Sequence, residues 1–290
     1  MGLQGPVLAA TDLSEAADEA IRQGHEIARQ LDAPFVVGHV LPEAFRVRVL
    51  FPHSAGFDDE TQRAIGDHAR DALRARIEAV AGVAPQIEID SGSAHAGILA
   101  IAERIGAGVI VLGPGTTARH VARAADVPVL IARPSPAGSV LGATDFSDPA
   151  IPAVRMAADE ASRRGVRLRL MHAIDVDITG TMGGAGLPGY IAPVPLPADV
   201  LEQLDAHATT RLAEAAAAIE TTAETVVVSG RPAAAIVEAA ASVPTALVVV
   251  GMRGRTGLAR LALGSVAERV ISDAPCSVLV VPLHPDSPPR

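Results

Sequence analysis

The chain repeats its own sequence, and this duplication limits its possible folds more than any other feature. The segment VLAATDLSEAADEAI matches VLGATDFSDPAIPAV further along, so that Thr11 corresponds to Thr144, 133 positions later. His39 corresponds to His172 with the same shift. The duplication predicts two tandem copies of one domain.

Each copy alternates two kinds of segment. Short runs of Val, Leu and Ile are followed by longer, Ala-rich amphipathic stretches, a pattern typical of βαβ units. We predict an α/β fold of two tandem doubly wound domains, 1–137 and 138–290, each with an open five-stranded parallel sheet and helices on both faces. The second copy shows strands near 139–144, 166–173, 224–228, 246–251 and 277–282, and helices near 148–164, 199–219, 232–242 and 265–273.

A loop rich in glycine follows the apolar run 246–250. In VVVGMRGRTGLARLALGSVAERVI, Gly251 and Gly254 precede a Gly264-Ser265 pair, which gives the spacing G-x2-G-x9-G-S. Glycine lets backbone N–H groups approach a phosphate closely, and the first turn of a helix carries about +0.5 of an elementary charge. Loop glycines can equally serve turns with positive φ, so the glycines alone leave both interpretations open.

This spacing, with its flanking strand and helix, resembles the nucleotide loop of the universal stress protein family, and the resemblance covers nearly the whole chain. It implies a Rossmann-like fold of the adenine-nucleotide type and a bound ATP, accompanied by Mg²⁺. It also implies that the carboxylate of Asp145 lies near the ribose and that the backbone of Ala173 meets the adenine. The residues assigned to the nucleotide in the second domain are Ala143, Thr144, Asp145, Ala173, Gly251, Met252, Arg253, Gly254, Gly264, Ser265 and Val266.

The first copy has a shorter loop. Only Pro114 separates Gly113 from the Gly115-Thr116 pair, so this loop lacks 11 residues of its counterpart. It keeps a strand, a Gly-Thr pair and a helix start, and we therefore predict two unequal sites, with the intact one in the second domain. The corresponding candidates in the first domain are Asp12, Val40, Gly113, Gly115 and Thr116.

The motifs coincide with the place where open α/β sheets bind ligands, which is the carboxyl end of the strands where their order reverses. Asp145 and Gly251 come just after the first and fourth strands of the second copy. A carboxylate can accept hydrogen bonds from hydroxyl groups. Capping of the next helix is the alternative role for Asp145, and we predict it for Ser147.

The sequence argues against an efficient enzyme. All 24 basic residues are arginines, and the absence of lysine excludes a Walker A loop, a protein kinase and a Schiff base. No Gly-x-Ser-x-Gly elbow occurs, and we predict that His39 and His172 are hydrogen-bonded, half-buried strand residues. We predict no catalytic residue and no metal held by protein side chains alone, although a metal-bound water near Asp145 leaves weak ATPase activity open.

The amino-acid composition of the chain limits the kinds of partner that it can bind. The net charge of −9 and the 2% of aromatic residues oppose binding of nucleic acid, which needs positive charge and stacking surfaces. The one cysteine, Cys276, is predicted to be a buried hydrophobe. No apolar run reaches 18 residues and the first residues do not resemble a signal peptide, so we expect a cytoplasmic protein without a membrane partner.

The family resemblance also implies contact between the final strands. Within one chain, PVLIA in the first copy and SVLVV in the second would pair as an intrachain pseudo-dimer, and a homodimer of chains is expected. The long connections 41–57 and 175–197 are expected to cover the two crevices. The function that follows is an ATP-binding stress-response regulator, acting through nucleotide-dependent conformation or partner binding with little or no hydrolysis. A nucleotide-independent interaction module and a weak ATPase or adenylate-transferring enzyme remain alternatives.

Overall fold

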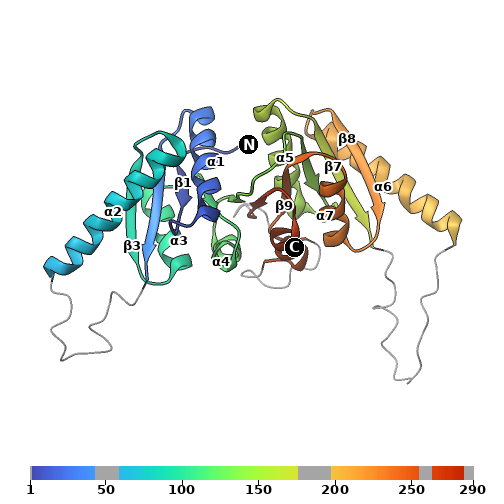
Figure 1. The fold of residues 1–290 in the computed structure, drawn as a ribbon. Coiled ribbons are helices and arrows are strands. Elements are labelled where there is room, and N and C mark those ends of the chain that lie inside the picture. Colours follow the sequence, from blue (N-terminus) through green and yellow to red (C-terminus); the bar gives the residue numbers. More distant parts are fainter. Residues whose placement is uncertain (1, 43–58, 176–196, 255–262, 284–290) are drawn as a thin grey trace, which may run out of the picture. The chain divides into compact units, whose positions relative to one another are not determined.

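The computed structural model describes residues 2–42, 59–175, 197–254 and 263–283, which form two compact units. The N-terminal unit comprises Leu3–Pro134 together with Ser277–Pro282, and the C-terminal unit is built chiefly from Ser135–Cys276. Figure 1 shows that each contains a sheet with helices.

In the described residues of the N-terminal unit, five parallel strands and four helices follow the predicted alternation. The sheet has the order β3-β2-β1-β4-β5, so the strand order reverses between β1 and β4. Right-handed crossovers therefore place α1 and α2 on one face and α3 and α4 on the other. The elements are β1 (Val7–Ala10), α1 (Glu15–Leu31), β2 (Phe35–Leu41), α2 (Asp59–Ala81), β3 (Gln86–Ser91), α3 (Ala94–Ile105), β4 (Val109–Leu112), α4 (Thr116–Ala124) and β5 (Val129–Ile131).

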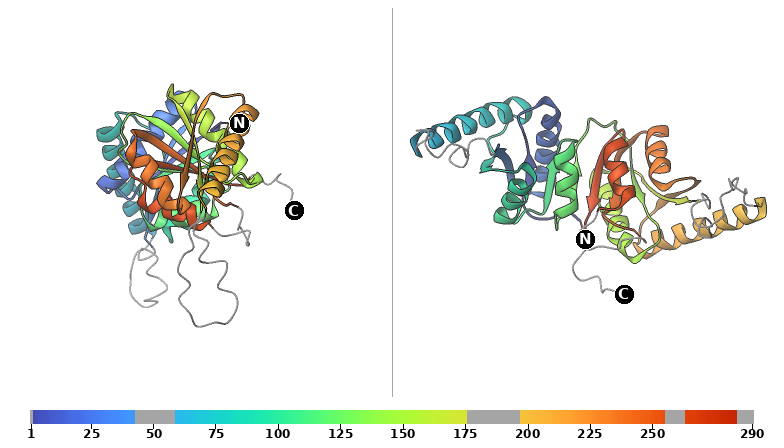
Figure 2. Two further views of the ribbon diagram at one scale, coloured as in Figure 1. Left: turned by 90° about the vertical axis from the view of Figure 1, so that its right-hand side faces the viewer. Right: turned by 90° about the horizontal axis from the view of Figure 1, so that it is seen from below.

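The C-terminal unit repeats this arrangement in its parallel strands, which run in the order β9-β6-β7-β8. Helix α5 packs on β6 and β9, and α7 packs against α8; Figure 2 shows the helices of each unit on both sides of its strands. The elements are β6 (Ser139–Ala143), the short 3-10 turn η2 (Asp148–Ala150), α5 (Ile151–Arg164), β7 (Leu168–Ile174), α6 (Ala198–Ala218), β8 (Ala223–Ser229), α7 (Pro232–Ser242), β9 (Thr245–Gly251) and α8 (Ser265–Asp273). Each predicted boundary lies within two residues of the observed one, except that the helix predicted from 148 begins with η2 and continues as α5 from Ile151. The predicted α/β fold class is confirmed.

The last strand, β10 (Ser277–Val281), pairs antiparallel with β5 in the N-terminal unit, with Leu279 opposite Leu130. These are the SVLVV and PVLIA segments that the sequence analysis paired. The buried hydroxyl of Ser277 accepts a hydrogen bond from the Arg133 N–H (3.1 Å) and lies 3.0 Å from Nε2 of Gln23. A homodimer of whole chains stays a prediction.

The cores consist of aliphatic side chains, as the shortage of aromatic residues requires. All residues of β1, β4 and β10 are buried, and Cys276 is 1% exposed, which confirms its predicted burial. No described helix combines the length and apolar character that crossing a bilayer would need. The predicted covering loops 41–57 and 175–197 lie almost wholly outside the described residues, as do Arg255, Arg260 and the tail 284–290.

Candidate functional site

A cavity of about 1030 Å³ opens at the carboxyl ends of β6, β7 and β9 in the C-terminal unit. It lies where the strand order reverses between β6 and β9, the position at which open α/β sheets bind ligands. Its volume is at the upper end of the roughly 300–1,000 Å³ that small-molecule sites occupy. The structure brings together around it every residue assigned to the nucleotide in the second domain: Ala143, Thr144, Asp145, Ala173, Gly251, Met252, Arg253, Gly254, Gly264, Ser265 and Val266.

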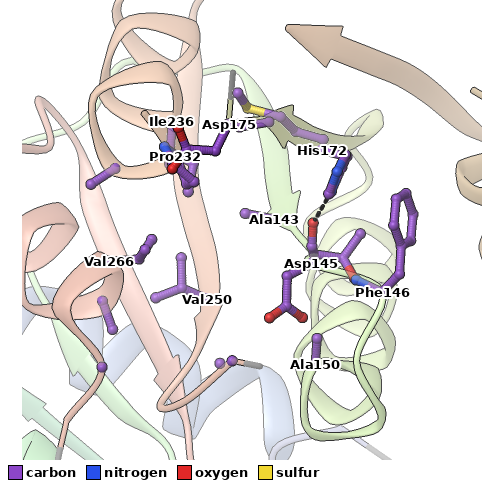
Figure 3. Close-up of a pocket in the computed structure, with 18 of the residues that line it drawn as sticks. Ala143, Asp145, Phe146, Ala150, His172, Asp175, Pro232, Ile236, Val250 and Val266 are labelled. Atoms are coloured by element: carbon purple, nitrogen blue, oxygen red, sulfur yellow. Dashed lines mark hydrogen bonds between the residues drawn. The ribbon is translucent and has the colours of Figure 1, made fainter. Parts of the chain in front are cut away.

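One wall of the cavity is the turn that follows β6. Oγ1 of Thr144 accepts a hydrogen bond from the Phe146 N–H (3.0 Å), and Phe146 adopts a left-handed φ of 62°. Oδ1 of Asp145 accepts hydrogen bonds from the Ser147 N–H (3.0 Å) and from its hydroxyl (2.5 Å). These bonds fix the turn, and Figure 3 shows the Asp145 carboxylate extending into the cavity between Val250 and Ala150.

The prediction that the side chain of Ser147 caps the next helix is wrong, because the hydrogen bond that a cap requires is missing. Ser147 occupies the N-cap position of η2 with extended backbone, but its side chain makes no capping bond. Its hydroxyl donates to Asp145, whereas a capping bond would require the hydroxyl oxygen to accept from a backbone N–H of the next turn. The same exchange occurs in the first copy, where Ser14 precedes α1, makes no capping bond and donates to Asp12.

His172 supports this turn from the neighbouring strand β7. Its Nδ1 lies 2.8 Å from the carbonyl oxygen of Thr144, so Nδ1 carries the proton and donates it. The imidazole stacks on Phe146 with ring centroids 4.2 Å apart, and the guanidinium of Arg211 lies 5.1 Å from the Phe146 ring. The histidine is half-buried and hydrogen-bonded, as predicted, and its ring nitrogen is committed to holding the turn in place (Figure 3).

The opposite wall is formed by the backbone after β9. The Gly264 N–H donates to the carbonyl oxygen of Met252 (2.9 Å), which closes the two ends of the glycine-rich loop on each other. A Cβ at Gly264 would lie 3.2 Å from that oxygen, and one at Gly254 would overlap the carboxylate of Asp145. None of Gly251, Gly254 and Gly264 adopts a positive φ. Close approach, rather than turn conformation, is therefore what these positions require of glycine.

Among the described residues four arginines line the cavity, and helix α8 begins beside it. Gly264 is the N-cap of α8, and the first residues of the helix face the cavity, so their backbone amides favour an anion there. Only Arg253 was predicted from the sequence. The other three, which are spread over α6, the start of α7 and α8, carry no local motif and come together only in the folded chain: Arg211, Arg231 and Arg269.

The far end of the cavity is largely apolar, although Asp175 and Arg231 also line it. Ala173 and Ile174 at the end of β7 face Pro232 and Ile236 of α7 across it. Small and aliphatic side chains on two sides leave a slot that suits a flat, apolar group. The cavity thus offers an apolar end, a carboxylate between the walls, and a cationic end rich in backbone amides.

The N-terminal unit has a smaller cavity, of about 310 Å³, at the equivalent place. It is lined by all five predicted first-domain residues: Asp12, Val40, Gly113, Gly115 and Thr116. The turn after β1 reproduces the hydrogen bonds of its counterpart. The Leu13 N–H donates to Oγ1 of Thr11, and the Ser14 N–H donates to Oδ1 of Asp12. Nδ1 of His39 lies 2.8 Å from the carbonyl oxygen of Thr11. No arginine occurs among the described residues that line this cavity.

The carboxylate of Asp12 remains negatively charged in this setting. The side chain of Asp12 is exposed, but partial loss of surrounding water at the turn still raises its pKa. The hydrogen bonds from Ser14 and the electrostatic effect of His39 lower the pKa by more than desolvation raises it. The net result is a pKa below the ordinary value. Within the described part of the chain, no group of three or more His, Cys, Asp or Glu side chains is arranged to hold a metal ion.

Comparison with known proteins gives consistent matches. The family model for the universal stress protein family matches residues 5–133 and again 137–282. The universal stress protein in the QAH/OAS sulfhydrylase 3' region of Thermus aquaticus is 34% identical over 144 residues, 49% of this chain and 97% of that protein. Universal stress protein MJ0531 of Methanocaldococcus jannaschii is 34% identical over 138 residues, 48% of this chain and 78% of its own.

A solved structure resembles the whole chain. The crystal structure of a universal stress protein from Archaeoglobus fulgidus aligns with this chain at a TM-score of 0.64. The alignment covers 96% of this chain and 98% of that protein. The two sequences are 20% identical, so this likeness concerns the fold alone.

Proposed function

The chain belongs to the universal stress protein family, and from this premise we propose that its C-terminal unit binds ATP and acts as a nucleotide-dependent stress-response regulator. The observation that carries the proposal is the single cavity lined by all the residues assigned to the nucleotide from the sequence of the second domain. They come from segments after three different strands, and their convergence at the switch point is what a ligand site in this fold requires.

The chemistry of the cavity supports each part of an adenine nucleotide. The apolar end at Ala173 and Ile236 suits the base, and the Asp145 carboxylate can accept hydrogen bonds from the ribose hydroxyls. The closely packed backbone at Gly254 lets a phosphate approach the main chain, and the first turn of α8 presents backbone N–H groups to it. Arginine adds charge-assisted hydrogen bonds to phosphate.

We propose that Mg²⁺ accompanies the nucleotide and is held mainly by phosphate oxygens. Mg²⁺ favours oxygen ligands and usually keeps several waters, so it needs no complete set of protein ligands. Its charge would reduce repulsion among the phosphates, while Asp145 and Asp175 are the carboxylates among the described lining residues.

Regulation would follow from a difference in affinity between two states of the protein. A ligand shifts an equilibrium only by as much as it prefers one state, and a ligand at 100 times its Kd stabilises the state that binds it by about 2.7 kcal/mol. We propose little or no hydrolysis, because the bonds that the structure gives to these two side chains hold the turn: Nδ1 of His172 donates to Thr144, and Oδ1 of Asp145 accepts both bonds from Ser147.

The test begins with the nucleotide that the purified chain carries, identified by mass spectrometry after denaturation. Calorimetric titration of the stripped chain with Mg-ATP should then give about one ATP per chain. Gly254→Ala should reduce binding strongly because its methyl group would overlap Asp145, whereas the control Gly66→Ala should not, since its Cβ would meet nothing within 4 Å. No binding at millimolar ATP would reject the proposal in favour of an interaction module that works without nucleotide.

A further inference from the structure

We infer that the smaller cavity of the N-terminal unit binds a ribonucleoside without phosphates. The first observation is that its turn repeats the hydroxyl-accepting arrangement of the larger cavity. The Ser14 and Ser147 N–H groups lie 3.0 Å from their carboxylates, and both histidines lie 2.8 Å from the threonine carbonyl. Because Oδ1 of Asp12 accepts both bonds from Ser14, Oδ2 is the oxygen that ligand hydroxyls would reach.

The apolar end of the cavity is also retained. Val40, Ala94 and Ile98 line it at the positions that correspond to Ala173, Pro232 and Ile236 in the larger cavity. Val40 is larger than its counterpart, but it packs on a glycine of α3, Gly97, at which a Cβ would lie 2.7 Å from Val40. The extra volume is therefore taken up beside the helix, and the slot for a flat group remains.

The end that would receive phosphates is reduced by the short loop. Gly113 ends against the start of α1, where a Cβ would lie 2.8 Å from the carbonyl oxygen of Ala16. After Pro114 the chain enters α4 directly, at Thr116. The resulting volume, about 310 Å³ against about 1030 Å³, is at the low end for a small-molecule site. It leaves room for a nucleoside but not for a triphosphate chain as well.

Charge acts in the same direction as volume. The described lining residues include the ionised Asp12 and no arginine. The N-terminus of α4 contributes roughly half a positive charge, which one carboxylate outweighs. A phosphate placed here would lie near a like charge, whereas an uncharged ribose would offer two hydroxyl donors to it.

This inference rests on the proposed function of the larger cavity, because the ribose role of Asp12 is carried over from Asp145. It extends that function: the chain would recognise a phosphorylated ligand in one copy and an unphosphorylated one in the other. The two duplicated cavities would thus discriminate between a nucleotide and its nucleoside by the charge and length of the ligand.

The experiment titrates the full-length Gly254→Val chain, in which the larger cavity is obstructed, with adenosine, AMP and ATP by calorimetry. Adenosine should bind at one per chain and at least ten times more tightly than AMP. Asp12→Ala should weaken adenosine binding by roughly tenfold or more, because it removes a charged acceptor of hydroxyl hydrogen bonds. Asp12→Asn keeps an oxygen for Ser14 but loses the charge, so it should narrow the gap between AMP and adenosine.

Three outcomes would overturn the inference, of which the first two are AMP or ATP binding as tightly as adenosine to the Gly254→Val chain, and no adenosine binding at millimolar concentration. Should Gly254→Val not fold, the same titrations are made on the wild-type chain saturated with ATP. ATP binding to the wild-type chain is measured separately, and its absence would reject the proposed function instead. If adenosine binding is lost in Asp145→Ala but kept in Asp12→Ala, the nucleoside binds in the larger cavity, and this too would overturn the inference.

Discussion

The two copies of the duplicated domain share a turn and differ in a loop. After β1 and after β6, the same threonine, aspartate and serine make the same hydrogen bonds, and a histidine from the next strand holds each turn. After β4 the chain passes through Pro114 into the helix, whereas after β9 a long glycine-containing loop intervenes. The loop and the arginines, not the turn, therefore account for the difference between a small cavity without a lining arginine among the described residues and a large one with several.

The largest effect should come from giving the second copy the short loop of the first. Replacing residues 252–263 by one proline would copy the Gly-Pro-Gly connection that follows β4. We expect ATP affinity to fall at least a hundredfold, because the phosphate end would lose the backbone amides of the loop and Arg253, and would keep only those of α8. Calorimetry measures the affinity, and circular dichroism checks that the helix content is kept. We expect it to be kept because the N-terminal unit folds with the same short loop. Unchanged ATP binding would mean that the loop is not the source of the difference.

The two matching aspartates should differ in their effect on ATP. Asp145→Ala is expected to weaken ATP binding by about tenfold to a hundredfold, since hydrogen bonds to a charged group contribute about 1.5–3 kcal/mol. Asp12→Ala, which removes the same side chain from the same turn, should leave ATP affinity unchanged. Equal losses in the two variants, measured by titration with Mg-ATP, would show that both cavities take the nucleotide.

Arginine substitutions sharpen the comparison at the phosphate end. Arg253→Ala should lower ATP affinity about tenfold, and high salt should reduce the difference because the contact is charge-assisted. The matched control is Arg74→Ala, which removes an exposed arginine of α2 that lies 3.3 Å from Asp71. A loss of the same size in the control would assign the effect to the net charge of the chain rather than to the cavity.

The smallest effect concerns acid stability of the N-terminal unit. The pKa of Asp12 is lowered in the folded chain, mainly by the hydrogen bonds from Ser14 acting against desolvation. Its contribution to stability is therefore present above the pKa of the unfolded chain and is lost as pH falls through the folded pKa. Chemical unfolding between pH 6 and pH 3, chosen as about two units around the ordinary carboxylate range, should show a slightly steeper loss for the wild-type chain than for Asp12→Asn. Parallel curves would contradict this.

Hydrophobic periodicity was sufficient to place the elements, because each strand is a short aliphatic run and each helix has one buried face. The sequence motifs also located the two walls of the cavity at Asp145 and Gly251. What the sequence could not supply depends on contacts between distant elements. Arg211 and Arg269 reach the cavity from helices without any local motif, and the stacking of His172 on Phe146 joins two segments that are separated by α5.

Two local interpretations were decided only by geometry. Sequence left open whether the loop glycines serve positive φ or close approach, and the contact of Gly254 with Asp145 indicates close approach. The cap predicted at Ser147 was wrong, because a residue preference does not reveal that a carboxylate two positions earlier takes the hydroxyl. Short-range preferences fail where neighbouring polar groups compete for the same partner.

The pairing of β10 with β5 has a consequence for how the protein is made. Strand β5 ends at residue 131, and its partner begins at residue 277. At a synthesis rate of about 5–20 residues per second, the N-terminal unit waits on the order of ten seconds for the strand that covers its edge. During that interval β5 presents unpaired backbone groups to other nascent chains. The first domain to be translated is thus the last to be completed, and loss of the C-terminal strand would damage the opposite end of the sequence.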